Sequence, residues 1–383
     1  MDFQYEELFD SSFSLRSGYF FVYPKNDEMQ IRQGHLSACN VSISGSENDT
    51  WIKSAFELLS SGTKLQEVCK EVPNEKVDQF VKIVLSLRVN YLQINTANSS
   101  ESKNSSLKYQ TLLLENSDKS KFLKESMADA QILLIGSGIL GSRVAINLAQ
   151  YDVGNLTLLD RKVITHKDKY QNPAYVLASE GQPRATELRN FLVKMTGIDK
   201  ITSEHMENMD KTRLAQLIKS HSMVLMVEDI FDPNLYHFVN QNAIQTKTPW
   251  MMAMIDGWDM YIEPTFIPFQ TGCYECLNQT HITQMDNGDT FLKYEEYLKD
   301  NGFIGELVLT LALADIAAGF LSSELPQVMG IMPQRIDFNS SLTLGRQLHI
   351  NLRNYDATFR NIIKFPRCSV CSLKNDDSLN LYT

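Results

Sequence analysis

The run Gln131–Lys162, which reads QILLIGSGILGSRVAINLAQYDVGNLTLLDRK, constrains the fold more than any other stretch. A short apolar strand leads into a turn with Gly136, Gly138 and Gly141, and an amphipathic helix and a second apolar strand follow, ending at Asp160. This is the pattern of a βαβ unit in a nucleotide-binding fold. The glycines let the backbone approach a phosphate, the helix start offers free N–H groups, and the acid can bind ribose hydroxyls. These four residues are the candidate nucleotide ligands.

The composition excludes several classes of protein. The chain has 383 residues, of which 43% are hydrophobic and 21% charged, and this predicts a globular protein of two or three domains. The net charge of −10 argues against nucleic-acid binding. The acidic start MDFQYEELFD is not a secretory signal, and the apolar run Gly305–Phe320 is too short and too charged to span a membrane. We therefore expect a cytoplasmic protein whose apolar run is a buried helix.

A polar stretch, NTANSSESKNSS, predicts a linker at residues 96–106, between a module at 1–95 and a larger domain at 107–383. The module has strand-like segments (YFFVYP, MQIRQG and CNVSISG) followed by three helical ones, the second short and capped by Thr63. This order predicts a small α+β winged helix-turn-helix. Its second helix carries as many acidic as basic residues, which argues against duplex DNA. A strand edge beside a helix can instead bind an extended peptide.

The larger domain alternates predicted helices and strands. Helices are expected at about 108–126, 182–195, 233–246 and 305–320, and strands at 222–229, 250–255 and 342–352. Such alternation indicates an α/β, Rossmann-like domain with a mostly parallel sheet and helices on both faces. The aromatic residues Trp258 and Tyr261 either line a groove near the sheet end or pack in the core.

Two Cys-x-x-Cys pairs are the strongest chemical signal. They are Cys273 with Cys276, and Cys368 with Cys371. Each pair can direct two thiolates at one ion, and two pairs complete a tetrahedral zinc site. Four thiolates leave no open coordination position, so the zinc is expected to be structural. A redox-active disulfide pair is the alternative, although two pairs fit it poorly.

The glycine turn, the acid-ended strand and the two cysteine pairs together resemble the ThiF/MoeB family, the activating-enzyme fold of ubiquitin-like pathways. The resemblance covers about residues 107–373 and is most specific at VGNLTLLDRK, PFQTGCYECLNQ, LVLTLALADIAAG and RCSVC. It implies ATP and Mg²⁺ as cofactors and the adenylation of a peptide or protein C-terminus. It also implies a homodimer.

The departures from the family pattern concern the ATP site. Lys162 stands where the pattern has a second acid, and Gln171 and Asn172 stand where it has an Arg–Gln pair. Arg184 replaces a phosphate-contacting lysine, and the magnesium acid corresponds to Asp229, with Glu228 as the alternative register. Adenylation needs cations around the triphosphate, so these changes favour a degenerate, non-adenylating site.

The N-terminal module is similar to the leader-recognition element of proteins that mature ribosomally made peptides. The resemblance implies that the leader of a precursor peptide binds as an added strand against an edge strand and the third helix. The residues expected to contact it are Met29, Gln30, Ile31, Arg32, Lys76, Gln79, Lys82 and Ile83.

Two functions follow from these resemblances. In the first, the chain binds the leader and presents the core peptide to a YcaO-type cyclodehydratase that forms thiazoles and oxazoles, followed in some pathways by a flavin-dependent azoline oxidase. In the second, it is an active adenylating enzyme of the microcin C type that uses Asp160, Arg184 and Asp229. A sulfur-transfer activating protein is a third possibility, which the N-terminal module and the lack of a free cysteine in the larger domain argue against.

Overall fold

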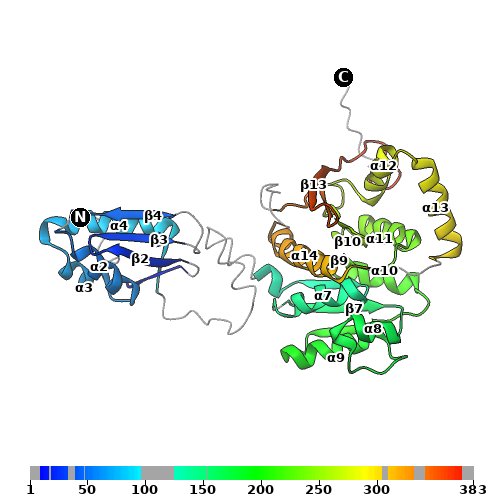
Figure 1. The fold of residues 1–383 in the computed structure, drawn as a ribbon, viewed down its shortest axis with the longest axis horizontal. Helices are drawn as coiled ribbons and strands as arrows, with labels where there is room; N and C mark the ends of the chain where they lie inside the picture. Colours follow the sequence, from blue (N-terminus) through cyan, green and yellow to red (C-terminus); the bar gives the residue numbers. More distant parts are fainter. Residues whose placement is uncertain are drawn as a thin grey trace, which may run out of the picture. The chain divides into compact units, whose positions relative to one another are not determined.

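The computed structural model of the chain describes residues 9–16, 19–32, 39–46, 48–95, 125–151, 153–303, 309–331 and 341–372. The chain divides into two units, Met1–Lys121 and Phe122–Thr383, each with its own core (Figure 1). The expected linker at 96–106 and most of the helix expected at about 108–126 lie outside the described residues. The domain limits therefore remain predictions.

The first unit contains a three-stranded antiparallel sheet, in which β3 lies between β2 and β4. A separate antiparallel pair joins β1 to β5. The strands are β1 (Phe13–Leu15), β2 (Phe20–Lys25), β3 (Glu28–Arg32), β4 (Val41–Ser44) and β5 (Leu92–Ile94). The helices are α2 (Trp51–Ser60), α3 (Leu65–Val68) and α4 (Val77–Asn90), with 3-10 turns at Cys69–Glu71 and Asn74–Lys76. Strands followed by three helices, the second short, were expected, and the winged helix-turn-helix assignment remains a prediction.

The strand containing MQIR was expected to be an edge strand, and this was wrong. Hydrogen bonds join β3 to strands on both sides, and Met29 and Ile31 are fully buried. They pack in a core that also contains the rings of Phe56 and Phe80, which meet edge to face at 5.4 Å between centroids. The expected cap of the second helix was also wrong, because α3 begins after Lys64 and no side chain caps it.

The second unit is built on one eight-stranded sheet with the order β13-β12-β11-β10-β9-β6-β7-β8. The five strands from β10 to β8 are parallel, and β11, β12 and β13 extend the sheet antiparallel beyond β10. The bounds are β6 (Gln131–Ile135), β7 (Asn155–Asp160), β8 (Ile201–His205), β9 (Met223–Met226), β10 (Trp250–Asp256), β11 (Asp259–Ile262), β12 (Arg346–Asn351) and β13 (Asp356–Asn361). The mostly parallel sheet is confirmed.

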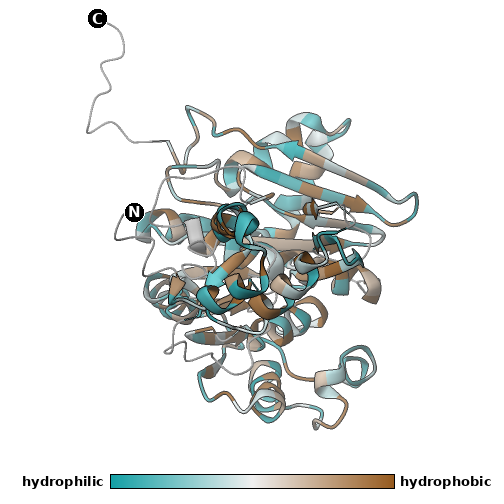
Figure 2. Ribbon diagram, turned by 90° about the vertical axis from the view of Figure 1, so that its left-hand side faces the viewer, coloured by the Kyte–Doolittle hydropathy of each residue, from teal (hydrophilic) through white to brown (hydrophobic). Residues whose placement is uncertain are grey.

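Helices flank this sheet in two groups, because α7 packs against α9 and α14 while α10 packs against α11. Leu133 and Ile135 of β6 join a core with α10 and α11, and the alternate residues Ile132 and Leu134 are equally buried on the other face. Figure 2 shows hydrophobic strands among helices with hydrophilic outer faces. The helices are α7 (Ile139–Ala149), α8 (His166–Gln171), α9 (Arg184–Thr196), α10 (Lys211–Ser220), α11 (Pro233–Thr246), α12 (Tyr274–Gln284), α13 (Gly288–Asn301) and α14 (Leu311–Ile331), with a 3-10 turn at Pro173–Tyr175.

The apolar run near residue 310 forms the buried helix that was expected. It is α14, whose Leu313, Ala317 and Leu321 are fully buried and which packs along α7. Among the described residues, no helix combines the length and apolar character needed to cross a bilayer. Residues 304–308, at the start of the predicted helix, lie outside the described part of the chain.

Candidate functional site

The glycine turn lies where the strand order of the parallel sheet reverses. The chain leaves β6 at this turn, with β7 on one side and β9 on the other, and this switch point is where open α/β sheets bind ligands. Gly136 has a φ of +102°, and a Cβ atom there would lie 2.8 Å from the carbonyl oxygen of Val227. A Cβ at Gly141 would lie 1.9 Å from the carbonyl oxygen of Gly136. Both glycines are therefore required by packing alone.

Asp160 ends β7 as predicted, and its carboxylate is held by backbone groups. One oxygen accepts a hydrogen bond from the Ser137 N–H at 2.6 Å, and the other accepts one from the Lys162 N–H at 2.6 Å. The residue is almost fully buried. The carboxylate therefore braces the glycine turn and lies at the ribose position that the βαβ pattern predicts.

Asp229, rather than Glu228, faces the glycine turn, and its assignment as the magnesium acid remains a prediction. Its carboxylate accepts hydrogen bonds from the Ile139 N–H at 2.8 Å and the Leu140 N–H at 3.2 Å. These amides begin α7 and carry the positive end of its dipole, the usual place for a bound anion. A Cβ on Gly138 would lie 1.9 Å from the same carboxylate. An acidic side chain thus occupies the amides that the sequence pattern assigns to a phosphate.

Glu228 is buried behind the turn. One of its carboxylate oxygens has no hydrogen-bond partner within the described chain. Burial, and then the negative charge of Asp160, raise the pKa of Glu228 to about 7.

Arg184, the candidate phosphate contact, is already paired. Its guanidinium donates from Nη2 to Asp168 Oδ1 at 2.6 Å and from Nε to Asp168 Oδ2 at 3.2 Å, and both side chains are nearly buried. Burial lowers the pKa of Arg184, but Asp160 and Asp168 more than offset it and raise that pKa overall. Sequence reasoning missed Asp168. The signal was present, because Thr165 and Asp168 form a capping box at the start of α8.

Two further residues that hold the site were missed or misread. The fully buried Tyr175 donates its hydroxyl to the Ser137 carbonyl at 2.5 Å and lies 3.3 Å from the Arg184 carbonyl, joining the glycine turn to α9. Asn172 was read only as part of the replacement for an Arg–Gln pair. It is buried and donates to the Gly138 carbonyl at 3.2 Å and to Ser142 Oγ at 2.7 Å.

The charge balance around the turn is negative. The acidic side chains there outnumber the basic ones, and Arg161 is also paired, through one hydrogen bond of 2.8 Å to Asp232. The acidic residues are Asp160, Asp168, Glu228, Asp229 and Asp232, and the basic residues are Arg161, Lys162 and Arg184.

The four predicted zinc ligands come together in the second unit. Cys273 and Cys276 lie at the start of α12, and Cys368 and Cys371 follow β13. All four are buried, with their Sγ atoms within 4.8 Å of one another, and the closest pairs are 3.6 and 3.7 Å apart. A tetrahedron of sulfurs about 2.3 Å from zinc has edges of about 3.8 Å, whereas a disulfide needs about 2.05 Å. The cluster is suited to one zinc ion.

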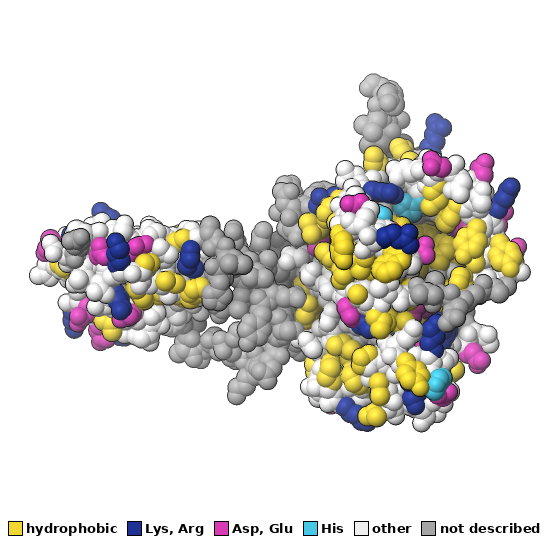
Figure 3. Space-filling view, in the orientation of Figure 1, with side chains coloured by type: hydrophobic (Ala, Val, Ile, Leu, Met, Phe, Trp, Pro, Cys, Tyr) yellow, Lys and Arg dark blue, Asp and Glu magenta, His cyan; other side chains and the backbone are white. Residues whose placement is uncertain are grey.

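A cavity of about 410 Å³ lies along the ends of β10 and β11, and Asp229 is among its lining residues. Figure 3 shows hydrophobic side chains gathered around a hollow on this face of the second unit. Tyr261 lines the cavity, as one of the two sequence interpretations held, while Trp258 is 48% exposed and is not among the lining residues.

The residues predicted to contact a peptide differ in how exposed they are in the first unit. Met29 and Ile31 belong to its core, and Gln30, Arg32, Lys76 and Ile83 are half-buried. Only Gln79 and Lys82 are exposed.

Comparison with known proteins agrees with this geometry. The sequence profile of the ThiF family matches residues 110–370. The molybdopterin-synthase adenylyltransferase of Escherichia coli (strain K12) is 29% identical over 160 residues, which cover 41% of this chain and 61% of that protein. The chain thus spans about three fifths of the length of this curated relative.

Solved structures show a likeness over nearly the whole chain. The structure of E. coli MccB with ATP superposes with a TM-score of 0.66 at 16% identity, covering 94% of this chain and 99% of MccB. MccB in complex with N-formylated MccA gives a TM-score of 0.66 at 14% identity with the same coverage. PaaA gives 0.64 at 13% identity, covering 91% and 99%. At these identities the likeness concerns the fold alone.

Proposed function

Since this chain belongs to the ThiF family, we propose that it is a peptide-binding member that no longer adenylates. It binds the leader of a ribosomally made precursor peptide and presents the core peptide to a partner enzyme. The partner is a YcaO-type cyclodehydratase that forms thiazole and oxazole rings, with a flavin-dependent azoline oxidase as a further partner. The protein acts in the cytoplasm as a homodimer, with a structural zinc ion in the four-cysteine cluster.

One observation carries the loss of adenylation: groups that could bind phosphate are already bound by carboxylates of the chain. Asp229 accepts hydrogen bonds from the first amides of α7, and Asp168 forms an ion pair with Arg184. A bound triphosphate would have to displace both in a site where acids outnumber bases. Its charge would also lack the cations that stabilise phosphoryl transfer. ATP and Mg²⁺ are therefore not used in turnover.

The edge strand β4 is the site of strand addition in this proposal. The other edge, β2, contains Pro24 and a register shift between Val22 and Lys25, and both features block a further strand. β4 has no proline. The Gly45 N–H donates to the Asp27 carbonyl. Because antiparallel strands alternate between inward and outward hydrogen-bonding residues, the N–H groups of Ile43 and Val41 also point inward to β3.

By the same alternation, the N–H groups of Ser42 and Ser44 point to the free edge, and both side chains are exposed. Lys76, just before α4, pairs at 3.8 Å with Asp49 in the segment that follows β4, so the start of α4 lies near the residues between β4 and α2. The exposed residues Gln79 and Lys82 of α4 can then contact side chains of the added peptide. A peptide strand with acidic residues fits this edge.

Active adenylation is the second candidate, and one observation favours it. The fold likeness to MccB, which has been solved with ATP and with N-formylated MccA, extends over 94% of the chain. In that function Asp160, Arg184 and Asp229 would contact ATP and Mg²⁺ and adenylate a peptide C-terminus, which requires Arg184 to leave Asp168.

Pyrophosphate exchange separates the two functions. The full chain is assayed with Mg-ATP, with and without the precursor peptide, while calorimetry measures binding of the leader alone. We expect no exchange and leader binding at micromolar or tighter concentration. Peptide-dependent exchange would establish the adenylating function instead.

The edge is tested with Ser42→Pro, which removes one outward N–H and leaves the β3 pairing intact. We expect leader affinity to fall at least tenfold, because a main-chain hydrogen bond is lost and the ring obstructs the edge. Ser42→Thr keeps the N–H and is the matched control. Equal affinity in the proline variant would exclude β4 as the binding edge.

A further inference from the structure

The cavity at the ends of β10 and β11 has an apolar wall and a polar end. Methionine and aromatic side chains form much of the apolar wall, among them Met252, Met254, Phe231, Phe291 and Tyr294. Its volume of about 410 Å³ lies within the range of small-ligand pockets. Thioether sulfurs make favourable contacts with aromatic rings. The walls are therefore suited to a planar, apolar group.

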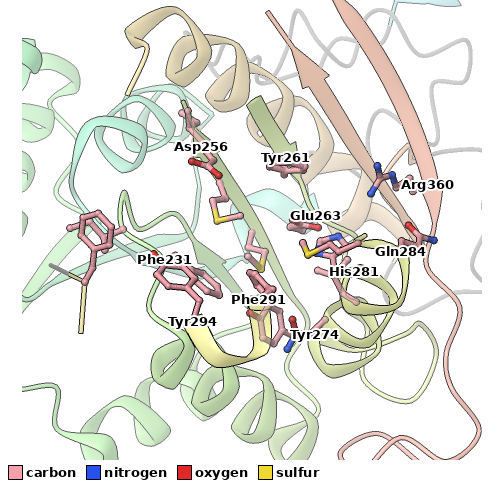
Figure 4. Close-up of a pocket in the computed structure, with 18 of the residues that line it drawn as sticks. Phe231, Asp256, Tyr261, Glu263, Tyr274, His281, Gln284, Phe291, Tyr294 and Arg360 are labelled. Atoms are coloured by element: carbon pink, nitrogen blue, oxygen red, sulfur yellow. The ribbon is translucent and has the colours of Figure 1, made fainter. Parts of the chain in front are cut away.

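The polar end of the cavity contains a carboxyl group that the core does not need. Glu263, directly after β11, is 1% exposed yet lines the cavity. Gln347 of β12 donates from Nε2 to Glu263 Oε2 at 2.7 Å and lies 2.9 Å from His281 Nε2. Figure 4 shows Glu263 beside His281, across the cavity from the aromatic rings of Phe291 and Tyr294. A carboxyl buried in an apolar wall is costly unless it binds a partner.

The groups at this end accept hydrogen bonds. Because the Gln347 amide donates to both neighbours, His281 Nε2 is an acceptor, and the remaining capacity of Glu263 is open to a donor. Arg360 also lines the cavity and keeps this end from being strongly negative. Asp229 and Asp256 also line the cavity, but the apolar wall makes the desolvation of a full charge costly, so a neutral N–H or O–H donor fits these acceptors.

We propose that this cavity binds one side chain of the precursor peptide, and that it selects an aromatic side chain with a hydrogen-bond donor, tyrosine or tryptophan. The proposal rests on the proposed function in that the natural occupant belongs to the presented peptide. The ring packs between the methionines and the aromatic wall. Its O–H or N–H donates to the carboxyl of Glu263, which Gln347 holds in place. The peptide then has a second contact, in the second unit, besides the strand added at β4.

The test uses the full chain labelled with ¹³C at the methionine methyl groups. N-acetyl-tyrosinamide, N-acetyl-tryptophanamide, N-acetyl-phenylalaninamide and N-acetyl-lysinamide are titrated to millimolar concentration, and methyl resonances are assigned by Met252→Leu and Met254→Leu. We expect saturable ring-current shifts at both methionines with the tyrosine and tryptophan probes. The phenylalanine probe should bind about tenfold more weakly, because it lacks the donor. The lysine probe should produce no saturable shift.

Glu263→Leu removes the acceptor and should abolish the preference for tyrosine over phenylalanine. Glu263→Gln is the conservative variant; it keeps one acceptor oxygen and should retain most of the preference. Three results would each overturn the proposal: no saturable shift with either donor probe, equal affinity for tyrosine and phenylalanine, or tightest binding of lysine. Because the probes lack a leader, failure of leader binding at β4 would leave this readout unchanged, so the two failures are distinguishable.

Discussion

Replacing Asp168 with asparagine tests whether the candidate nucleotide site is closed by the chain's own carboxylates. Asp168 holds Arg184 through two hydrogen bonds and also accepts from the Thr165 N–H at 2.7 Å. Asparagine is nearly the same size and keeps one acceptor for Thr165. Its amide N–H₂ cannot accept from the guanidinium, so Arg184 loses one of its two hydrogen bonds and its charged partner and is free to turn toward the glycine turn.

The magnitude follows from the burial of the pair. Removing one partner of a buried ion pair costs about 3–5 kcal/mol. Asp160 and Asp229 still act on Arg184, so we expect a smaller cost, about 2–3 kcal/mol. For a unit of this size that is a fall in Tm of about 5–10 °C. A freed arginine contributes about 1.5–3 kcal/mol to a phosphate contact, so Mg-ATP should bind about ten- to a hundredfold more tightly than to the native protein.

The assay is thermal unfolding with and without millimolar Mg-ATP, followed by calorimetry. Asp210→Asn is the matched control, because it makes the same change at the cap of α10, where the carboxylate accepts from the Thr212 and Arg213 N–H groups. We expect Mg-ATP to stabilise only the Asp168 variant. If the native protein binds Mg-ATP as tightly as the variant does, the carboxylates do not close the site.

Three other predictions concern stability. Chelation of zinc, or Cys276→Ser, should lower the Tm of the second unit by more than 10 °C, with loss of about one zinc per chain by elemental analysis; an unchanged Tm would show that the cluster does not hold a structural metal. The hydrogen bonds of His237 to Glu275 and then to Glu295 raise the pKa of His237 to about 9 from 6.5. The protonated His237 therefore contributes its full stabilisation of the folded state below pH 6.5, and this stabilisation is lost as the pH rises through about 9. His237→Gln should lower the free energy of unfolding by about 1–2 kcal/mol, a figure reduced for the partial exposure of the side chain. It should also flatten the dependence of that free energy on pH between 6.5 and 9. An unaltered slope would contradict this. Gly141→Ala should lower the free energy of unfolding in urea by about 3 kcal/mol or more, because the new Cβ meets the Gly136 carbonyl. Gly319→Ala, in open space on α14, should instead raise it by about 0.5–1 kcal/mol. Similar effects of the two substitutions would refute the packing argument.

Local patterns in the sequence predicted the second unit well. The βαβ unit, the helix Pro233–Thr246 and the cysteine cluster were found because each depends on residues close in sequence or on a distinctive spacing. The antiparallel strands β11 and β13 were missed. Every residue of β13 is exposed, so no alternation of apolar residues marks it.

The charges of the site were predicted only in part, because their partners are set by tertiary structure. Arg184 was correctly singled out, but its engagement by Asp168 depends on how α8 packs against the start of α9. The strand Glu28–Arg32 was placed at an edge because three strands in sequence do not reveal which one is central. Met29 and Ile31 are buried because their face of the strand packs against α2 in the core.

The cysteine cluster also makes the cavity dependent on metal supply. Cys276 and Cys368 bracket a closed loop of chain, and His281, Phe291 and Arg360 of the cavity all come from inside it. Cross-linking a loop of about 100 residues removes about 4–5 kcal/mol of unfolded-chain entropy. On the proposed function, loss of zinc would leave the first unit folded and able to bind the leader while the second peptide contact is lost.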